Sequence, residues 1–284
     1  MRRRKVLSMA LGGAAAQAQS AGEWENPVRR TLREGKPVLA ATITVPSADV
    51  AVQASRLGFD YLWIEMEHSA ITLETARNMI LATRGLPAVP FIRVPFNEIW
   101  LAKRALDIGA MGVIFPFTST PELARQAVAA CKYPPLGKRG SGAALATLRW
   151  PAPGGYADFA DRNAMVQIII EEKRAVEQIE EIAAVPGIDI IFIGTSDLSY
   201  SYGLRGRQDN PELQAAIRRV VAAARKNGIP VGRPALAGEI PRLMKEGFSV
   251  FQGASDLVLM AAGAAPLLEA VGKKAPDPKD RPLY

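Results

Sequence analysis

Short hydrophobic runs rich in valine and isoleucine alternate with longer amphipathic stretches from about residue 30 onward. The short runs predict β-strands, and the stretches between them, with apolar residues three or four positions apart, predict α-helices. Several strand runs are almost continuously apolar, as expected of a parallel sheet that is covered on both faces. The predicted strands are residues 37–45, 61–66, 90–94, 112–117, 165–171, 188–194, 229–234 and 248–253.

The clearest predicted helices lie between these strands, at residues 73–84, 121–130, 173–184, 211–227 and 238–246. About eight β-then-α units in succession, with no second cluster of strands, are typical of a (β/α)8 TIM barrel. An open doubly wound sheet is the alternative, and the pattern favours the barrel. Residues 31–272 would form this one domain, because such barrels routinely run to about 250 residues.

The first 18 residues resemble an export signal rather than a folded element. The basic residues Arg2 to Lys5 precede a mildly apolar stretch, and Ala16-Gln17-Ala18 fits an A-x-A cleavage site. The basic start also resembles the twin-arginine export pattern. We therefore expect a signal peptide at residues 1–18 and a periplasmic location, followed by a linker at 19–30 and, at the other end, a tail at 273–284. The alternative is a cytoplasmic enzyme with a basic N-terminal extension.

Composition excludes several kinds of partner. The net charge of +7 overstates the basicity of the predicted domain, because residues 2–5 supply four of the positive charges. No stripe of lysine and arginine interleaved with aromatic residues is present, so nucleic acid is not an expected partner. No segment approaches the ~18 uninterrupted apolar residues of a membrane span, so we expect no stable membrane insertion. The single cysteine, Cys131, excludes an internal disulfide and a cysteine-clustered zinc site, and we expect a buried structural thiol.

Titratable side chains occur where predicted strands end, which in a barrel is the face that carries the active site. His68, the only histidine, follows the second strand and suits proton transfer near neutral pH, although a hydrogen-bonded loop histidine is the alternative. Arg93 lies inside the third strand, where a buried guanidinium is costly unless it meets an anion. Glu171 ends the fifth strand and Asp197 follows the sixth. Two carboxylates without a cysteine or second histidine suit Mg²⁺ or Mn²⁺.

Two other segments are candidate parts of the same site. The turn Gly194-Thr195-Ser196 offers backbone N–H groups to an anion, and Gly194 allows close approach. The long interval between residues 117 and 165 would leave the C-terminal end of the fourth strand, so it predicts a functional loop on the active face. Taken singly, Glu171 could be a helix cap and Asp197 an ordinary turn residue. Their common position at strand ends favours an active site.

These motifs resemble those of the metal-dependent (class II) 2-oxo-acid aldolases of the HpcH/HpaI aldolase/citrate lyase family, which include dihydroxyheptenedioate aldolase and dehydro-deoxy-glucarate aldolase. The resemblance covers roughly residues 30–272. Its most specific segments are Y-P-P-L-G-K-R-G at 133–140 and F-I-G-T-S-D-L-S at 192–199. It also includes Glu67-His68, the P-F-I-R run that ends at Arg93, and the L-D-I-G-A run that contains Asp107.

The resemblance implies a TIM barrel of the phosphoenolpyruvate/pyruvate-domain type that reversibly cleaves a 4-hydroxy-2-oxo acid to pyruvate and an aldehyde through a metal-bound pyruvate enolate. It implies a divalent ion, Mg²⁺, Mn²⁺ or Co²⁺, held by Glu171 and Asp197. It also implies a homo-oligomer, commonly a hexamer built from dimers that exchange their last helix.

The same resemblance implies roles for the other candidate residues. His68 would be the base, with its basicity raised by Asp107, and Arg93 would stabilise the enolate. Ser196 would contact the substrate carboxylate, within the turn that also contains Gly194 and Thr195.

The chain departs from the family pattern at two places, which leaves the substrate open. Ile169 stands where close relatives carry a glutamine, and Glu65-Met66 stands where aspartate and glycine are common, so we expect a crowded loop before His68. Two alternative functions remain: a thioester lyase of the citrate or malyl-CoA type, and a periplasmic oxo-acid-binding protein without turnover. No distinct basic groove for coenzyme A phosphates supports the first, and the intact set of His68, Asp107 and Arg93 argues against the second.

Overall fold

A closed barrel of eight parallel strands forms the centre of the computed structural model, which describes residues 24–152 and 154–274. Each strand pairs with the next along the chain, and β8 pairs with β1 to close the sheet. The (β/α)8 prediction is therefore confirmed, with every strand boundary within two residues of its predicted place. The strands are β1 (Val38–Ile43), β2 (Tyr61–Glu65), β3 (Val89–Arg93), β4 (Gly112–Phe115), β5 (Met165–Ile170), β6 (Ile190–Ile193), β7 (Val231–Pro234) and β8 (Val250–Ser255).

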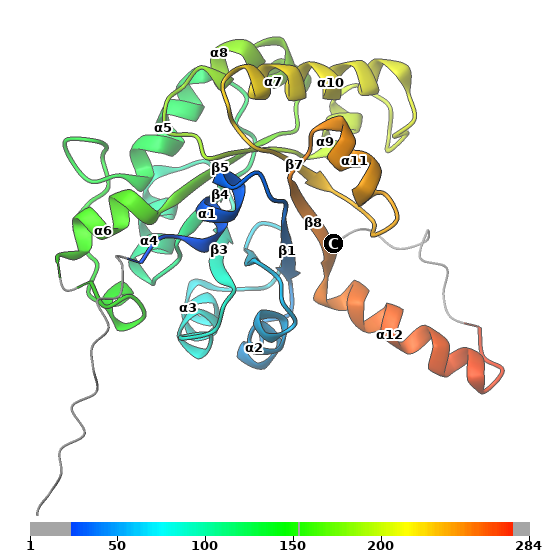
Figure 1. Ribbon diagram of the computed structural model, residues 1–284, viewed down its shortest axis with the longest axis horizontal. Helices are drawn as coiled ribbons and strands as arrows, with labels where there is room; N and C mark the ends of the chain where they lie inside the picture. The colour runs from blue at the N-terminus through cyan, green and yellow to red at the C-terminus, as the bar shows by residue number, and fades with distance from the viewer. Residues whose placement is uncertain (1–23, 153, 275–284) are drawn as a thin grey trace, which may run out of the picture.

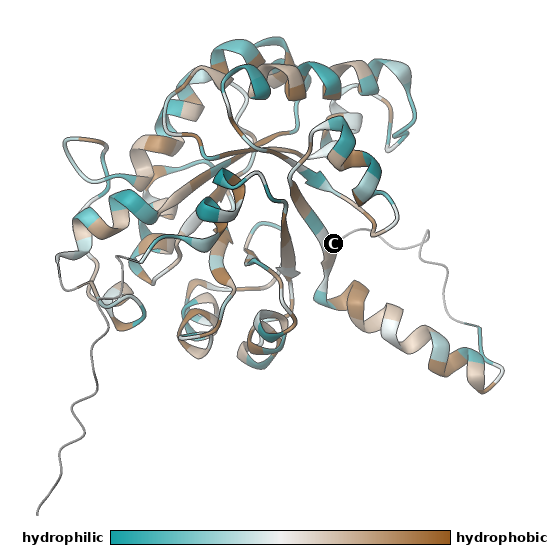
Figure 2. Ribbon diagram, in the orientation of Figure 1, coloured by the Kyte–Doolittle hydropathy of each residue, from teal (hydrophilic) through white to brown (hydrophobic). Residues whose placement is uncertain are grey.

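Helices surround the barrel (Figure 1), and they are hydrophilic mainly on the sides that face away from the strands (Figure 2). The helix predicted at residues 173–184 is two short helices that meet at Gln178. The helices are α1 (Pro27–Arg33), α2 (Ala48–Arg56), α3 (Leu73–Ala82), α4 (Ile99–Asp107), α5 (Pro121–Cys131), α6 (Tyr156–Asn163), α7 (Lys173–Glu177), α8 (Ile179–Ala183), α9 (Thr195–Ser201), α10 (Pro211–Lys226), α11 (Ile240–Glu246) and α12 (Asp256–Ala270), with a 3-10 turn at Ala146–Leu148.

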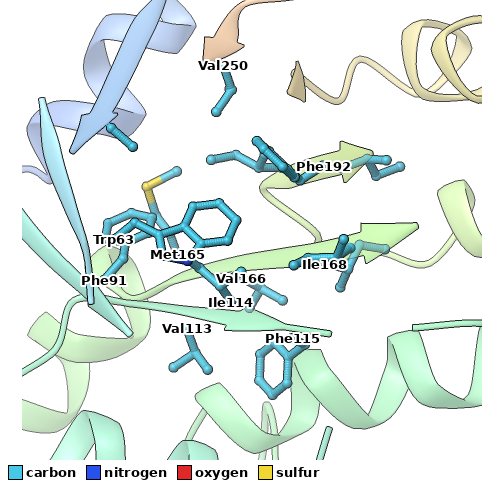
Figure 3. Close-up of a cluster of buried hydrophobic side chains, with 14 of the residues drawn as sticks. Trp63, Phe91, Val113, Ile114, Phe115, Met165, Val166, Ile168, Phe192 and Val250 are labelled. Carbon is cyan, nitrogen blue, oxygen red and sulfur yellow. The ribbon is translucent and has the colours of Figure 1, made fainter. Parts of the chain in front are cut away.

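Large apolar side chains pack on both faces of the strands, inside the barrel and between the barrel and the helices (Figure 3). The rings of Trp63 on β2 and Phe192 on β6 lie edge to face, with their centroids 5.0 Å apart. Because alternate residues of a strand point to the same side, the face of β2 that carries Trp63 ends in Glu65. In the same way the face of β3 that carries Phe91 ends in Arg93. The packed interior thus carries charged groups to the end of the barrel where the strands finish.

Residues 24–30 belong to the folded body, which corrects the linker predicted at 19–30. Asn26 is fully buried, and its side-chain amide donates to the carbonyl oxygens of Met111 at 3.2 Å and Asn163 at 3.0 Å. The ring of Trp24 packs against that of Trp150, with centroids 4.6 Å apart. Buried contacts of this kind tie the segment to the barrel. Residues 19–23, the predicted signal peptide at 1–18 and residues 275–284 of the predicted tail lie outside the described residues.

The long segment 132–164 lies at the opposite end of the barrel from the one we predicted. α5 begins at Pro121, soon after β4 ends, and carries the chain back to the end where the strands begin. The segment therefore joins α5 to the start of β5, where the Met165 amide donates to the Met111 carbonyl at 3.1 Å. We predicted a loop on the active face because the interval 117–165 begins where β4 ends. That prediction is wrong, because α5 lies within the interval and returns the chain to the other end of the barrel.

α12 extends away from the barrel instead of packing on it (Figure 1), and none of its residues is buried. Its first turn is anchored by Asp256, whose carboxylate accepts from the backbone N–H groups of Thr44 at 2.9 Å and Val45 at 2.8 Å. Further along, Met260 and Leu267 are 67% and 72% exposed. Beyond its first turn, α12 presents a largely apolar surface that no other element in the described part of the chain buries. Within residues 24–152 and 154–274, no helix has the length and apolarity required to cross a membrane.

Candidate active site

The predicted site residues Arg93, Glu171 and Asp197 meet at the C-terminal end of the barrel. Arg93 is the last residue of β3, Glu171 follows β5, and Asp197 lies in the first turn of α9, directly after β6. His68 follows β2 at the same end. In a parallel barrel all strands finish on one side, so residues far apart in the sequence come together there. This is the position predicted for the active site.

Arg93 is almost fully buried, at 1% exposure, and is surrounded by carboxylates. It forms an ion pair with Glu67, its Nη1 lies 3.3 Å from Oε2 of Glu65, and its Nη2 lies 3.7 Å from Oε2 of Glu171. A buried guanidinium is tolerated when it is paired in this way. The expectation that Arg93 meets an anion is therefore confirmed for the protein's own carboxylates, which fix the orientation of its positive charge.

Glu65 is completely buried and organises the loop that follows β2. Its Oε1 accepts hydrogen bonds from the backbone N–H groups of Glu67 at 2.7 Å and His68 at 3.0 Å. Its Oε2 accepts from the Trp63 indole at 3.0 Å. We expected Glu65 and its neighbour Met66 to crowd this loop, but the Glu65 side chain instead points into the barrel and holds the Glu67–His68 backbone in place.

Glu67 is a site residue that our list of candidates missed. Its carboxylate pairs with Arg93 and lies 3.8 Å from Nε2 of His68. Burial raises the pKa of Glu67 to about 8, against the opposing effect of Arg93 and with further increases from Glu171, Glu65 and Asp197. Its place beside the only histidine, within the Glu67-His68 motif, was the available signal. The sequence alone did not show that its side chain turns inward.

Glu171 is buried between the end of β4 and the start of α9. Its Oε1 accepts a 2.6 Å hydrogen bond from the backbone N–H of Phe117, which has the unusual backbone angle φ 47°. A non-glycine residue in this left-handed conformation is strained and often occurs at functional sites. Burial raises the pKa of Glu171 to about 7, while Arg93 and the Phe117 N–H act in the opposite direction and Asp197 adds to the rise.

Gly194 allows α9 to start directly against Glu171. A Cβ atom at Gly194 would lie only 2.8 Å from Oε2 of Glu171 and 3.2 Å from Cγ2 of Ile169. Thr195 and Ser196 follow as the first residues of α9, where backbone N–H groups have no partner within the helix. The predicted turn is therefore a helix start that lies next to Glu171. Ile169, on the strand that leads to Glu171, is buried, at 2% exposure.

His68 and Asp107 lie at opposite ends of the barrel within one chain. His68 follows β2, and its side chain is 44% exposed. Asp107 is the last residue of α4, which starts after β3 and runs back to the end where the strands begin. Its Oδ1 accepts a 3.1 Å hydrogen bond from Nη2 of Arg139. Within one copy of the chain, the structure therefore does not bring together the pair that the resemblance implies.

The chemistry of Glu171 and Asp197 fits a divalent metal ion. Burial, with a smaller contribution from neighbouring carboxylates, raises the pKa values of Glu67 and Glu171, and an added cation would stabilise their charged forms. Among the residues that the structure describes, no group of three or more His, Cys, Asp or Glu side chains is arranged to hold an ion. Magnesium is commonly bound through one or two carboxylates, with water and substrate oxygens as the other ligands. The two predicted ligands match this mode.

Comparisons with known proteins agree with the geometry. A family model described as HpcH/HpaI aldolase/citrate lyase matches residues 43–261. The chain is 36% identical to 2-dehydro-3,6-dideoxy-6-sulfogluconate aldolase of Pseudomonas putida, over 87% of this chain and 97% of that protein. It is 33% identical to hydroxypyruvate/pyruvate aldolase of Cupriavidus necator, over 89% and 94%. A solved HpcH/HpaI aldolase/citrate lyase family structure from Burkholderia cenocepacia superposes with a TM-score of 0.81 at 30% identity, covering 87% of this chain and all of that one.

Proposed function

Because this chain belongs to the HpcH/HpaI aldolase/citrate lyase family, we propose that it is an aldolase that reversibly cleaves a 4-hydroxy-2-oxo acid to pyruvate and an aldehyde. The observation that carries this proposal is the buried Arg93 held among Glu65, Glu67 and Glu171, beside His68, at the end of the barrel. The relatives that match over most of the chain are aldolases, so the thioester-lyase and binding-protein alternatives are not favoured.

Arg93 supplies a positive charge to the enolate oxygen that develops when the carbon–carbon bond breaks. Its guanidinium is already oriented by Glu65 and Glu67, so little reorganisation is needed as the charge forms. Glu65 also fixes the backbone of His68, which places the imidazole at the rim of the same site. A preorganised cation next to a positioned base is the arrangement that enolate chemistry requires.

His68 moves the proton. In the cleavage direction it takes the proton from the 4-hydroxyl group, and in the reverse direction it takes a proton from C3 of pyruvate. Histidine suits both steps because its ordinary pKa lies close to neutral pH. Its exposed side chain can reach a substrate that lies over the Arg93 guanidinium.

Glu171 and Asp197 would hold the divalent ion, Mg²⁺, Mn²⁺ or Co²⁺. When bound, the ion supplies Lewis-acid charge to the oxygens of the 2-oxo acid. The N–H groups at the start of α9, at Thr195 and Ser196, would receive the substrate carboxylate.

We also propose that the working enzyme is a homo-oligomer, a hexamer by resemblance, in which α12 packs on a second copy. Exposed apolar side chains along α12, including Met260 and Leu267, support an interface there. A small apolar groove lined by Leu57 and Val50 lies beside the first turn of α12 and has a volume of about 170 Å³. Within such an assembly, Asp107 of one copy would support His68 of another.

One assay tests the proposed reaction. A panel of 4-hydroxy-2-oxo acids is incubated with Mg²⁺, Mn²⁺ or Co²⁺ and pyruvate release is measured, and the reverse reaction is measured with pyruvate or hydroxypyruvate and an aldehyde panel. We expect EDTA to abolish activity and each restored metal to recover part or all of it. Covalent trapping of pyruvate on a lysine by borohydride would contradict the proposal, because it marks the metal-free Schiff-base mechanism.

A further inference from the structure

The segment formed by residues 133–142 is the most specific motif of the chain that the proposed site does not use. It folds back on the end of α5: the N–H groups of Lys138 and Arg139 donate to the carbonyl oxygens of Ala129 at 2.7 Å and Lys132 at 2.8 Å. Gly137 makes this possible, because a Cβ atom there would lie 2.4 Å from the Lys132 carbonyl oxygen. The backbone of the segment is therefore fixed by the helix that precedes it.

This fixed backbone buries the side chain of Arg139 beside Asp107. Arg139 is only 1% exposed, and its guanidinium lies over the rings of Tyr133, 4.6 Å from the centroid, and Tyr156, 5.6 Å from the centroid. Packing against two aromatic rings leaves the guanidinium little freedom to rotate. One of its nitrogens, Nη2, donates to Oδ1 of Asp107 at 3.1 Å.

The other oxygen of the Asp107 carboxylate is enclosed by the same segment. A Cβ atom at Gly142 would lie 2.8 Å from Oδ2 of Asp107, so only glycine lets the backbone approach so closely. The Asp107 side chain nevertheless keeps 18% exposure. The Asp107 carboxylate thus contacts Arg139 at Oδ1 and lies close to the Gly142 backbone at Oδ2, and it remains partly exposed. It lies at the opposite end of the barrel from His68 of the same copy.

We propose that Arg139 is the positioning residue for Asp107, and that the segment 133–142 serves to present this carboxylate to the histidine of a neighbouring copy. This inference rests on the proposed role of Asp107. Arg139 acts only through Asp107: it fixes the direction in which Oδ1 and Oδ2 point, and it does not touch substrate. A carboxylate that orients a catalytic imidazole must itself be oriented, as in catalytic triads.

A purely structural role for Arg139 is the competing explanation, and Arg149 provides the matched control. Arg149 lies in the same long segment, is also buried, and stacks over a ring, that of Trp150, at 4.7 Å. Its Nη1 donates to the Ile80 carbonyl oxygen at 2.6 Å, at the end of α3, and not to a carboxylate. Substitutions at Arg149 therefore report the cost of removing a buried, stacked arginine from this region.

The test uses exchange of the pyruvate methyl protons in D₂O, followed by NMR with Mg²⁺ or Mn²⁺ present, because this half-reaction needs no aldehyde. Arg139→Met should lower kcat by about 10- to 100-fold, the range typical of lost orienting groups, with the KM for pyruvate nearly unchanged. Arg139→Lys, which keeps the charge, should recover part of the loss. Arg149→Met should retain near-native exchange.

A double-mutant cycle separates positioning from structure. Arg139→Met should cause no further loss in an Asp107→Asn background, because the group through which it acts is already disabled. Equal losses in both backgrounds, or native turnover for Arg139→Met, would overturn the inference. If the Met variant does not fold, the same cycle with Arg139→Lys decides between these outcomes. Native exchange by Asp107→Asn would instead refute the proposed role of Asp107 itself, whereas a large Asp107→Asn effect with additive Arg139 losses overturns only the positioning role.

Discussion

Arg93 and the carboxylates around it show how single residues set the character of this site. One buried guanidinium contacts Glu65, Glu67 and Glu171. Burial raises the pKa values of Glu67 and Glu171, and the neighbouring carboxylates, whose charges Arg93 alone does not balance, add to the rise. The site is therefore prepared for an additional positive charge, and a divalent ion between Glu171 and Asp197 would provide it.

His68→Ala should lower the rate of pyruvate proton exchange by about 10²- to 10⁴-fold, the usual contribution of a general base. Pyruvate binding should persist, because the proposed contacts through Arg93 and the start of α9 remain. Exchange followed by NMR and pyruvate affinity followed by calorimetry check both parts. Near-native exchange by the variant would mean that another group is the base.

Cys131 should be inert to thiol reagents in the folded protein. Burial raises the pKa of its thiol to about 12, so at pH 8 it stays protonated, and its side chain has no exposed surface. Mass spectrometry after iodoacetamide treatment at pH 8 should show almost no labelling of the native protein and one label per chain in denaturant. Rapid labelling without denaturant would show that α5 opens readily or that the thiol is accessible.

The points at which helices and strands start and end determine where the site residues lie, and the junction of β6 and α9 is the clearest case. Gly194 lets α9 begin in direct contact with Glu171, so Asp197 in its first turn is brought beside that carboxylate. The β2–α3 loop is shaped in a similar way by Glu65, which accepts hydrogen bonds from two of its backbone N–H groups. Both junctions convert short sequence motifs into fixed positions at the mouth of the barrel.

Gly194→Ala should reduce metal-dependent exchange by about 10²-fold or more, because an angstrom-scale displacement of a catalytic group has effects of that size. The new methyl group would lie 2.8 Å from Oε2 of Glu171 and would push that side chain away. Gly238→Ala is the control, since nothing lies within 4 Å of a Cβ atom there. Metal binding measured by calorimetry should weaken in the first variant alone; unchanged binding in Gly194→Ala would contradict the prediction.

At the scale of the whole molecule, two features of the described residues support the proposed assembly. α12 has no buried residue, and His68 and Asp107 lie at opposite ends of the barrel. Packing between copies would cover the apolar surface of α12 and would bring His68 of one copy close to Asp107 of another. This is why assembly is part of the proposed function rather than an addition to it.

Charged substitutions on α12 should dissociate the assembly while leaving the barrel folded. Met260→Asp combined with Leu267→Asp places two carboxylates on the exposed apolar surface, where burial against a second copy would be costly. Light scattering at micromolar concentration should show smaller species, and circular dichroism should be unchanged. Arg242→Asp on the exposed surface of α11 is the control. A wild-type protein that is a stable monomer would refute the proposed assembly.

Residues 1–18 are proposed to direct export and to be removed, on the basis of their basic start and the Ala16-Gln17-Ala18 site. Deleting them should leave folding and exchange activity intact, because the described contacts of the folded body begin at Trp24 and Asn26, after the deleted residues. Intact-mass analysis of the protein from the periplasm should give the mass of a chain that starts at residue 19. An uncleaved chain found only in the cytoplasm would refute the export proposal.

The sequence by itself determined the barrel, since strand and helix periods are local properties of the chain and eight alternating units leave few ways to bury their apolar faces. It also indicated His68, Glu171 and Asp197, because polar residues directly after buried runs must lie at the strand ends, and Arg93, because a guanidinium within a buried strand must meet an anion. The same reasoning failed for the segment 132–164. α5 runs back along the outside of the barrel, so the segment that follows it lies at the end where the strands begin. Following β4 in the sequence therefore did not place this segment at the end of the barrel where β4 finishes.

Only the tertiary structure decided which side chains meet. Glu65 and Glu67 are two residues apart and both contact Arg93, yet Glu65 also accepts hydrogen bonds from backbone N–H groups whereas Glu67 lies near His68, a difference set by the fold of the loop. The partner of Asp107 is likewise decided by the fold, because Arg139 is 32 residues away along the chain. Such contacts depend on packing between elements, and no local pattern encodes them. Local periodicity therefore sufficed for the architecture, whereas the charge network of the site required the folded chain.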